Sequence, residues 1–280
     1  MSWVLVALGA WALGWWVNSR LAASPLARTQ GGKLAVPVIF GLTILILWEG
    51  LVRGLNVSPV ILPPPSAVAV RFAESLPILW GDFVQTAVKG ALSGYLIGCA
   101  AAFATAIVID RSPFLQRGLL PVGNFVAALP IVGIAPIMVM WFGFDWQSKA
   151  AVVVVMVFFP MLVNTIAGLK ASDAMQRDLL ATYSASYTQT LLKLRLPSSM
   201  PYLVTSLKVG MAASLVGAIV GELPTGAVAG LGARLLSGSY YGQTVQIWAA
   251  LFAAAVVAAG MVMLIGMVER GTLKRMGMAR

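Results

Sequence analysis

Residues 149–159 read KAAVVVVMVFF, an almost uniformly apolar run that indicates how this chain folds. A strand of a membrane barrel alternates apolar and polar residues over about ten positions, and this run shows no such alternation. A helix satisfies its own backbone hydrogen bonds inside lipid, so it is the conformation expected for such a run. The stretch therefore predicts a membrane-spanning α-helix.

The composition of the whole chain also indicates a membrane protein. Of the 280 residues, 60% are hydrophobic and only 10% are charged, which lies well outside the usual composition of soluble domains. A bilayer core of roughly 30 Å requires about 20 apolar helical residues. Runs that approach or reach this length predict an all-α, polytopic helical bundle with spans at 3–18, 34–51, 84–109, 119–142, 150–169, 202–220 and 245–267.

The positions of Lys and Arg predict how the bundle is oriented. If the N-terminus is outside, the inner loops carry most of the basic residues, whereas the outer loops carry only Arg53, Arg71, Lys149 and Arg234. The positive-inside rule then places the N-terminus outside and the C-terminus in the cytoplasm. The net charge of +10 is explained by this bias and requires no nucleic-acid partner.

The first span has some features of a secretory signal, because small residues at 21–27, LAASPLA, offer a cleavage site. No basic region precedes the apolar run, and its positive charges follow it, so a retained helix is favoured over a cleaved signal. Cys99 is the one cysteine and lies within a predicted span, which favours a packing role.

Several kinds of chemistry are excluded by the residues available. The chain has no His and one Cys, so it offers no His general base and no His- or Cys-based metal site. Residues 31–34, GGKL, lack the earlier Gly and the following Ser or Thr of a phosphate-binding loop. We expect no enzyme activity, no metal and no cofactor on this chain, and any ATP must be used by another chain.

Small residues and prolines predict how the spans pack and bend. Gly90, Gly94, Gly98 and Ala102 recur every four residues, and Gly217 and Gly221 repeat that spacing. Such rows favour close helix packing within one subunit over a seam between subunits, although both are possible. Three prolines are expected to interrupt the fourth and fifth spans: Pro130, Pro136 and Pro160.

The segment 172–196 is amphipathic between two apolar runs. Ser172 is expected to cap a helix whose apolar face carries Met175, Leu179, Leu180 and Tyr183. A break is expected at 184–186, before a second short helix with Tyr187, Leu191 and Leu194 on one stripe. Such a hairpin either lies on the inner leaflet or docks onto a cytoplasmic partner.

This segment resembles the cytoplasmic loop of permeases from type I ATP-binding-cassette importers. Their pattern is E-A-A-x-x-x-G, nine residues, then I-x-L-P, and the spacing is kept here. Asp178, Leu179 and Leu180 stand at the E-A-A positions, Ser184 at the Gly, and Leu194 at the Ile, while Leu196 and Pro197 match. Serine in place of Gly puts the turn geometry in question, because a Cβ makes some turn conformations costly.

The resemblance extends over residues 48–269. Residues 62–68, LPPPSAV, and 129–143, LPIVGIAPIMVMWFG, are similar to stretches of the nitrate, sulfonate, taurine and pyrimidine-precursor branch of these permeases. It implies the type I importer fold, with about six core helices in residues 34–280 and an extra N-terminal helix and linker in 1–33. The coupling helices would occupy 172–196.

The family assignment also implies partners. A second permease, identical or different, would share the transport path, with two ATPase subunits on the cytoplasmic side and a periplasmic solute-binding protein outside. ATP and Mg would be bound by the ATPase, and the protein would reside in the bacterial inner membrane. The solute would be a pyrimidine-like heterocycle or a small anion. The residues that would couple to the ATPase are Asp178, Leu179, Leu180, Tyr183, Ser184, Ala185, Leu191, Leu194, Leu196 and Pro197.

Polar side chains within the spans are candidates for the transport path. For Lys208 a structural ion pair is as well supported as substrate contact, and Glu222 is either a gate or a loop anchor. The full set is Lys208, Glu222, Asn124, Asn164, Ser93 and Tyr95.

A self-sufficient secondary transporter or channel is the alternative function. It would predict inverted repeats and coupling carboxylates at mid-membrane, and the sequence shows no convincing example of either. An intramembrane enzyme would need a nucleophile and a base, which the spans do not offer.

Overall fold

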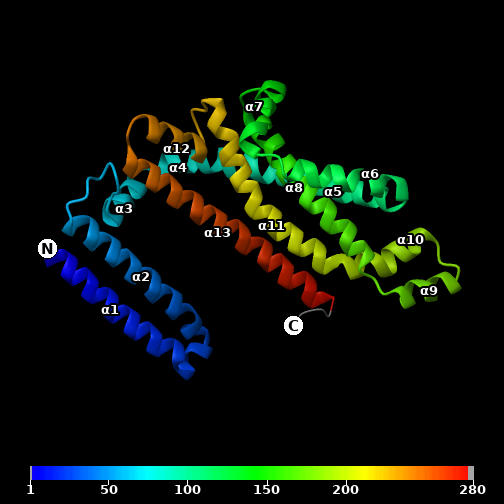
Figure 1. The fold of residues 1–280 in the computed structure, drawn as a ribbon, viewed down its shortest axis with the longest axis horizontal. Coiled ribbons are helices and arrows are strands. Elements are labelled where there is room, and N and C mark those ends of the chain that lie inside the picture. The colour runs from blue at the N-terminus through cyan, green and yellow to red at the C-terminus, as the bar shows by residue number, and fades with distance from the viewer. Residues whose placement is uncertain (1, 277–280) are drawn as a thin grey trace. The chain divides into compact units, whose positions relative to one another are not determined.

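The computed structural model describes residues 2–276, and every regular element in that range is a helix (Figure 1). The predicted all-α membrane fold is confirmed. Within the described range, five helical stretches are long and apolar enough to cross a membrane: Gly31–Gly54, Leu76–Asp110, Trp146–Lys170, Tyr187–Glu222 and Thr244–Thr272.

Two of the predicted spans are not among these five. Residues 3–18 do form a helix, α1 (Ser2–Ala23), but it is not among the five membrane-length stretches. Residues 119–142 form two helices, α6 (Pro113–Ala127) and α7 (Ile131–Phe142), so a continuous span there is wrong. Pro130 precedes α7 with extended backbone, which confirms the predicted interruption at that proline.

The other two prolines do not interrupt their helices. Pro136 lies inside α7, and Pro160 lies inside α8 (Trp146–Lys170). The predicted interruptions at these positions are therefore wrong. A proline removes one backbone hydrogen bond, and a long helix whose other bonds are intact continues past it.

The chain contacts divide the protein into two compact units, of which the first comprises residues 2–77 and 235–252. It begins with α1, a short 3₁₀ turn (Pro25–Arg28) and α2 (Gln30–Gly54). The α1 and α2 backbones lie close together, because a Cβ placed on Gly50 would lie 2.2 Å from the Cβ of Ala7. Glycine at this position therefore permits the hairpin of the two helices.

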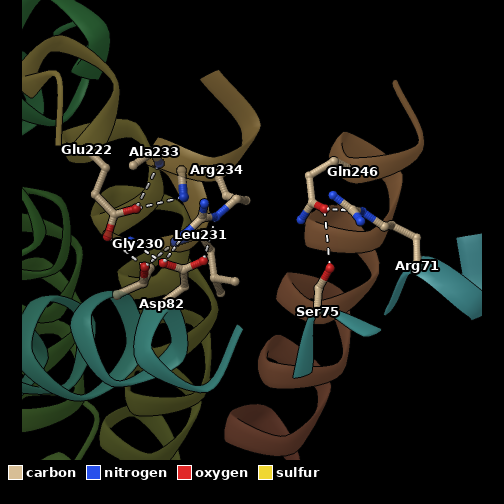
Figure 2. Close-up of polar contacts among 11 residues, drawn as sticks. Arg71, Ser75, Asp82, Glu222, Gly230, Leu231, Ala233, Arg234 and Gln246 are labelled. Carbon is tan, nitrogen blue, oxygen red and sulfur yellow. Dashed lines mark hydrogen bonds and ion pairs between the residues drawn. The ribbon is translucent and has the colours of Figure 1, made fainter. Parts of the chain in front are cut away.

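Helix α3 (Pro65–Glu74) and the first part of α13 (Thr244–Arg275) complete this unit. Figure 2 shows Gln246 of α13 accepting hydrogen bonds from Arg71 Nε at 2.7 Å and from Ser75 Oγ at 3.3 Å. The Phe72 and Phe252 rings add an edge-on contact with centroids 5.3 Å apart. These side chains attach α3 to the start of the last helix.

The second unit comprises residues 78–234 and 253–276 and is built around α8. Helix α4 (Leu76–Phe83), a π-helical stretch (Val84–Leu92) and α5 (Ser93–Asp110) run on without a break. A Cβ on Gly94 of α5 would lie 2.5 Å from the Ala150 carbonyl oxygen of α8. The row of small residues on α5 therefore packs within this chain, as favoured from the sequence.

Helix α11 (Leu196–Glu222) approaches α8 through its own glycines. A Cβ on Gly217 would lie 2.7 Å from the Met156 sulfur, and one on Gly221 would lie 3.3 Å from the Lys149 Cα. The core between α5, α8 and α11 is apolar and includes the buried thiol of Cys99, which confirms its packing role.

The remaining elements are α9 (Ala174–Thr182), α10 (Tyr187–Thr190), a π-helical turn (Leu191–Arg195), a 3₁₀ turn (Leu223–Thr225) and α12 (Leu231–Tyr240). The domain boundary between residues 33 and 34 stays a prediction.

Candidate functional site

A helical hairpin of α9 and α10 follows the end of α8. The cap of α9 is Asp173, whose Oδ1 accepts a hydrogen bond from the Met175 amide at 2.9 Å. The predicted cap, Ser172, is wrong; its Oγ instead accepts from Arg177 Nη1 at 3.0 Å. A carboxylate cap is favourable at this end because it faces the positive end of the helix dipole.

The turn between the two helices lies at 183–186, where a break was predicted. Ser184 has φ +53°, a left-handed conformation that glycine adopts more readily, so this residue carries some backbone strain. Ser186 then starts α10 with a capping box: its Oγ accepts from the Gln189 amide, and Gln189 Oε1 accepts from the Ser186 amide at 2.8 Å. The capping box fixes the direction in which the chain leaves the turn.

An apolar face of α9 is exposed. Met175, Leu179 and Tyr183 recur every four residues and are 78%, 56% and 76% exposed. Asp178 and Ser184 are also exposed, whereas Leu180 and Ala185 are half-buried. The predicted apolar face is therefore present, with Leu180 partly turned away from it.

The second half of the hairpin differs from the sequence prediction. Helix α10, the π-helical turn and α11 form one continuous helical stretch, Tyr187–Glu222, with Pro201 inside it. Leu191 belongs to the interior, at 6% exposure, so its predicted place on a docking stripe is wrong. Leu194, Leu196 and Pro197 are half-buried along the same stretch.

Two arginines attach this hairpin to the end of α8. Arg177 Nη1 donates to the carbonyl oxygen of Lys170, the last residue of α8, at 3.4 Å and to that of Ser172, in the linker after α8, at 2.6 Å. Arg195 Nε donates to the Leu169 carbonyl oxygen at 3.0 Å. Arg195 also pairs with Asp110 at the end of α5, with two N–O distances of 2.6 and 2.7 Å. Asp110 could not be predicted as a site residue, since its partner Arg195 lies 85 positions away in the sequence.

An open pocket lies beside this pair. It is lined by Asp110, Arg111, Ser186, Tyr187, Thr188 and Arg195. The Arg111 guanidinium carbon is 4.6 Å from the centre of the Tyr187 ring, a cation–π contact. Tyr187 therefore contacts the end of α5 rather than extending the exposed apolar face.

The polar residues predicted to line a path lie in different surroundings. Lys208 of α11 is ion-paired with Glu269 of α13, the structural alternative considered from the sequence. Tyr95 is buried and donates to the Leu207 carbonyl oxygen at 3.0 Å, and Ser93 Oγ donates to carbonyl oxygens of its own helix, including that of Gly90. Each of these three groups has a partner inside the chain.

The two asparagines give less information about a path. Asn164 is exposed on α8. Asn124 lies on α6, and its side chain falls outside the part of the chain that the structure describes. The role of all these residues in transport stays a prediction.

Glu222 is fully buried at the end of α11 and anchors the loop that follows (Figure 2). It accepts from Thr86 Oγ1 and from the Gly232 amide, both at 2.6 Å, and from the Ala233 amide at 3.4 Å. The loop-anchor alternative for Glu222 is therefore what the structure shows.

Asp82 makes a second set of contacts with the same loop. Its Oδ1 accepts from the Gly230 amide at 2.8 Å, and its Oδ2 accepts from Arg234 Nε at 2.9 Å. Figure 2 shows both carboxylates directed at residues 230–234 from neighbouring helices. Asp82 was not among the predicted site residues, because only the fold brings it to this loop.

Comparison with known proteins identifies the sequence relatives of this chain. Residues 94–272 match the family described as binding-protein-dependent transport system inner membrane component. The formylaminopyrimidine transport permease of Halalkalibacterium halodurans is 32% identical over 70% of this chain and 78% of its own length. The riboflavin transport system permease of Chloroflexus aurantiacus is 30% identical over 88% and 91% of the two chains. A putative aliphatic sulfonates transport permease of Bacillus subtilis is 26% identical over 82% and 84%.

Proposed function

This chain belongs to the family of binding-protein-dependent transport system inner membrane components, and we propose that it is the membrane-spanning subunit of an ATP-driven importer whose α9–α10 hairpin docks onto the ATPase. The apolar membrane-length helices and the permease relatives support a multi-pass transport subunit. The docking of the hairpin is the further step, and it rests on the contacts described above.

The observation that carries the proposal is the exposed apolar face of α9. Three apolar side chains, Met175, Leu179 and Tyr183, lie more than half exposed. Arg177 of the same helix donates a hydrogen bond to the Lys170 carbonyl oxygen at the end of α8, at 3.4 Å. An amphipathic helix of this kind fits a hydrophobic groove of another protein, where its apolar face is removed from water. The attachment to α8 favours docking over a helix that lies loosely on the membrane surface.

The partners follow from the family. A second permease, two ATPase subunits and a periplasmic solute-binding protein would complete the importer, and the ATPase would bind ATP and Mg. ATP binding would bring the ATPase subunits together and shift the docked hairpins, so that the path opens on the other side. No bond in the solute would change.

The solute is a small molecule under this proposal. Relatives are named for formylaminopyrimidine, riboflavin, aliphatic sulfonates, taurine, bicarbonate and nitrate. We expect a pyrimidine-like heterocycle or a small anion. The measurement that decides is calorimetric titration of a candidate periplasmic solute-binding partner, using a pyrimidine, taurine and nitrate as separate probes.

The docking proposal is tested by co-purification with a candidate ATPase subunit. Tyr183→Asp places a charge on the exposed apolar face, and we expect at least about 30-fold weaker ATPase binding, as for loss of a strong interface contact. The matched control is Val228→Asp, since Val228 is 94% exposed and lies far along the chain, in the loop after α11. Unchanged binding of the Tyr183 variant would contradict docking through α9. If the unaltered chain binds no ATPase yet transports a solute, the secondary transporter or channel is supported instead.

A further inference from the structure

The Asp110–Arg195 ion pair joins the end of one membrane helix to the start of another. The Asp110 side chain is 2% exposed and that of Arg195 is 16% exposed. The pair is bidentate, which is the strongest and most directional form of an arginine–carboxylate contact. Removing one partner of such a buried pair leaves an uncompensated charge, so the two side chains hold each other in place.

The remaining polar atoms of the pair are also bonded. Tyr187 Oη donates to Asp110 Oδ2 at 2.8 Å, and Arg195 Nε donates to the Leu169 carbonyl oxygen at 3.0 Å. The guanidinium thus lies at the C-terminal end of α8, where the helix dipole is negative. One cluster of four residues therefore connects α5, α8 and α10.

These helices also connect to the rest of the second unit. Helix α10 continues through the π-helical turn into α11 without a break. Helix α8 packs against α5 at Gly94 and against α11 at Gly217, at distances that leave no room for a Cβ. Close-packed helices transmit a displacement because they have no free volume to absorb it.

We propose that Asp110 and Arg195 are positioning residues that make α10 move together with α5 and α8, so that a displacement of the hairpin reaches the membrane helices. The proposal rests on the proposed function for the source of that displacement, the ATPase. The geometric part of the proposal is that the pair fixes α10 relative to α5 and α8. This part requires no partner protein. The two parts can therefore be tested separately.

The first test uses the full-length protein in lipid nanodiscs without any partner. Spin labels are placed at Thr188→Cys on α10 and Asn164→Cys on α8, both exposed positions, in a Cys99→Ser background. Asp110→Asn is expected to widen the distribution of distances between the labels by about twofold or more, because α10 gains local freedom. A second label pair, Leu96→Cys on α5 and Val209→Cys on α11, reports on the helix bundle itself.

The outcomes separate a positioning role from a general structural one. A wider Thr188–Asn164 distribution with an unchanged Leu96–Val209 distribution supports the proposal. Widening of both distributions overturns it, since the pair would then only stabilise the fold, and so does no change in either. The control substitution is Glu74→Gln, because Glu74 forms an exposed ion pair with Arg71 and should alter neither distribution.

The second test adds the ATPase with Mg-ATP. In the otherwise unaltered labelled chain we expect ATP to shift the Leu96–Val209 distance, and in Asp110→Asn we expect the ATPase to bind within about twofold of normal while the shift is lost. A shift that persists in Asp110→Asn would overturn the role in transmission. If no ATPase binds to the unaltered chain, the proposed function fails, whereas the first test still decides whether the pair positions α10.

Discussion

Single buried carboxylates determine how the loop after α11 is held. Glu222 is fully buried yet accepts bonds from a side-chain hydroxyl and two backbone amides, so its oxygens are well supplied with donors. Burial of a charged group is unfavourable unless such partners are present. The loop residues and Glu222 therefore stabilise each other.

We predict that Glu222→Ala destabilises the protein strongly. The substitution leaves the Thr86 hydroxyl and the Gly232 amide without their acceptor, at about 1–3 kcal/mol for each buried donor. The measurement is the midpoint of thermal unfolding in detergent. Glu74→Ala is the matched control, because that carboxylate is exposed and its removal should shift the midpoint very little. Equal midpoints for the two variants would contradict an anchoring role for Glu222.

At the scale of elements, the α9–α10 hairpin shows what residue patterns can predict. Helical spacing and local turn chemistry act between near neighbours in the sequence. They were enough to predict the position of the hairpin, its break at 184–186 and the exposed Met175 and Tyr183. The continuity of α10 with α11 and the burial of Leu191 depend on what packs against them. The pattern of a single helix shows which side is apolar, but not whether the core of this chain or a partner covers that side.

The Asp110–Arg195 pair illustrates the same limit for the site. Arg195 occupies the unspecified position of the I-x-L-P pattern, and Asp110 ends an apolar run, so neither residue attracts attention in its own segment. Only the packing of α5 beside α8 and α10 brings them within 2.6 Å. The coupling segment was thus predictable from its motif, whereas the side chains that attach it to the bundle were not.

We predict opposite outcomes for two leucines of the hairpin. Leu191→Ala removes side-chain volume from the interior and should lower the free energy of unfolding by about 2–5 kcal/mol. Leu179→Ala changes an exposed side chain and should alter it by less than about 0.5 kcal/mol, while weakening ATPase binding. Unfolding midpoints and ATPase co-purification of the two variants check this. A stable Leu191→Ala variant would show that this residue is not part of the core.

At the scale of the whole molecule, composition predicted the fold class and most of the membrane helices. It succeeded because an apolar run of membrane length has few alternatives to a helix. It failed for residues 119–142, where apolar content was sufficient but Pro130 divides the run into α6 and α7. Hydropathy measures how favourable burial is, and it does not register where the backbone cannot continue as a helix.

The orientation of the chain in the membrane remains a prediction from its charges, and the structure supplies positions for testing it. In the sequence, Tyr183 precedes α11 and Val228 follows it. The 27 residues of α11 extend about 40 Å, which is longer than a bilayer core. In a Cys99→Ser background, Tyr183→Cys should react with a membrane-impermeant maleimide only after the membrane is opened. The basic residues that flank Tyr183 in the sequence predict that it faces the cytoplasm. Val228→Cys should react in intact spheroplasts. The reverse labelling would place the α9–α10 hairpin outside the cell, where no ATPase could reach it, and would exclude docking as the function of its exposed apolar face.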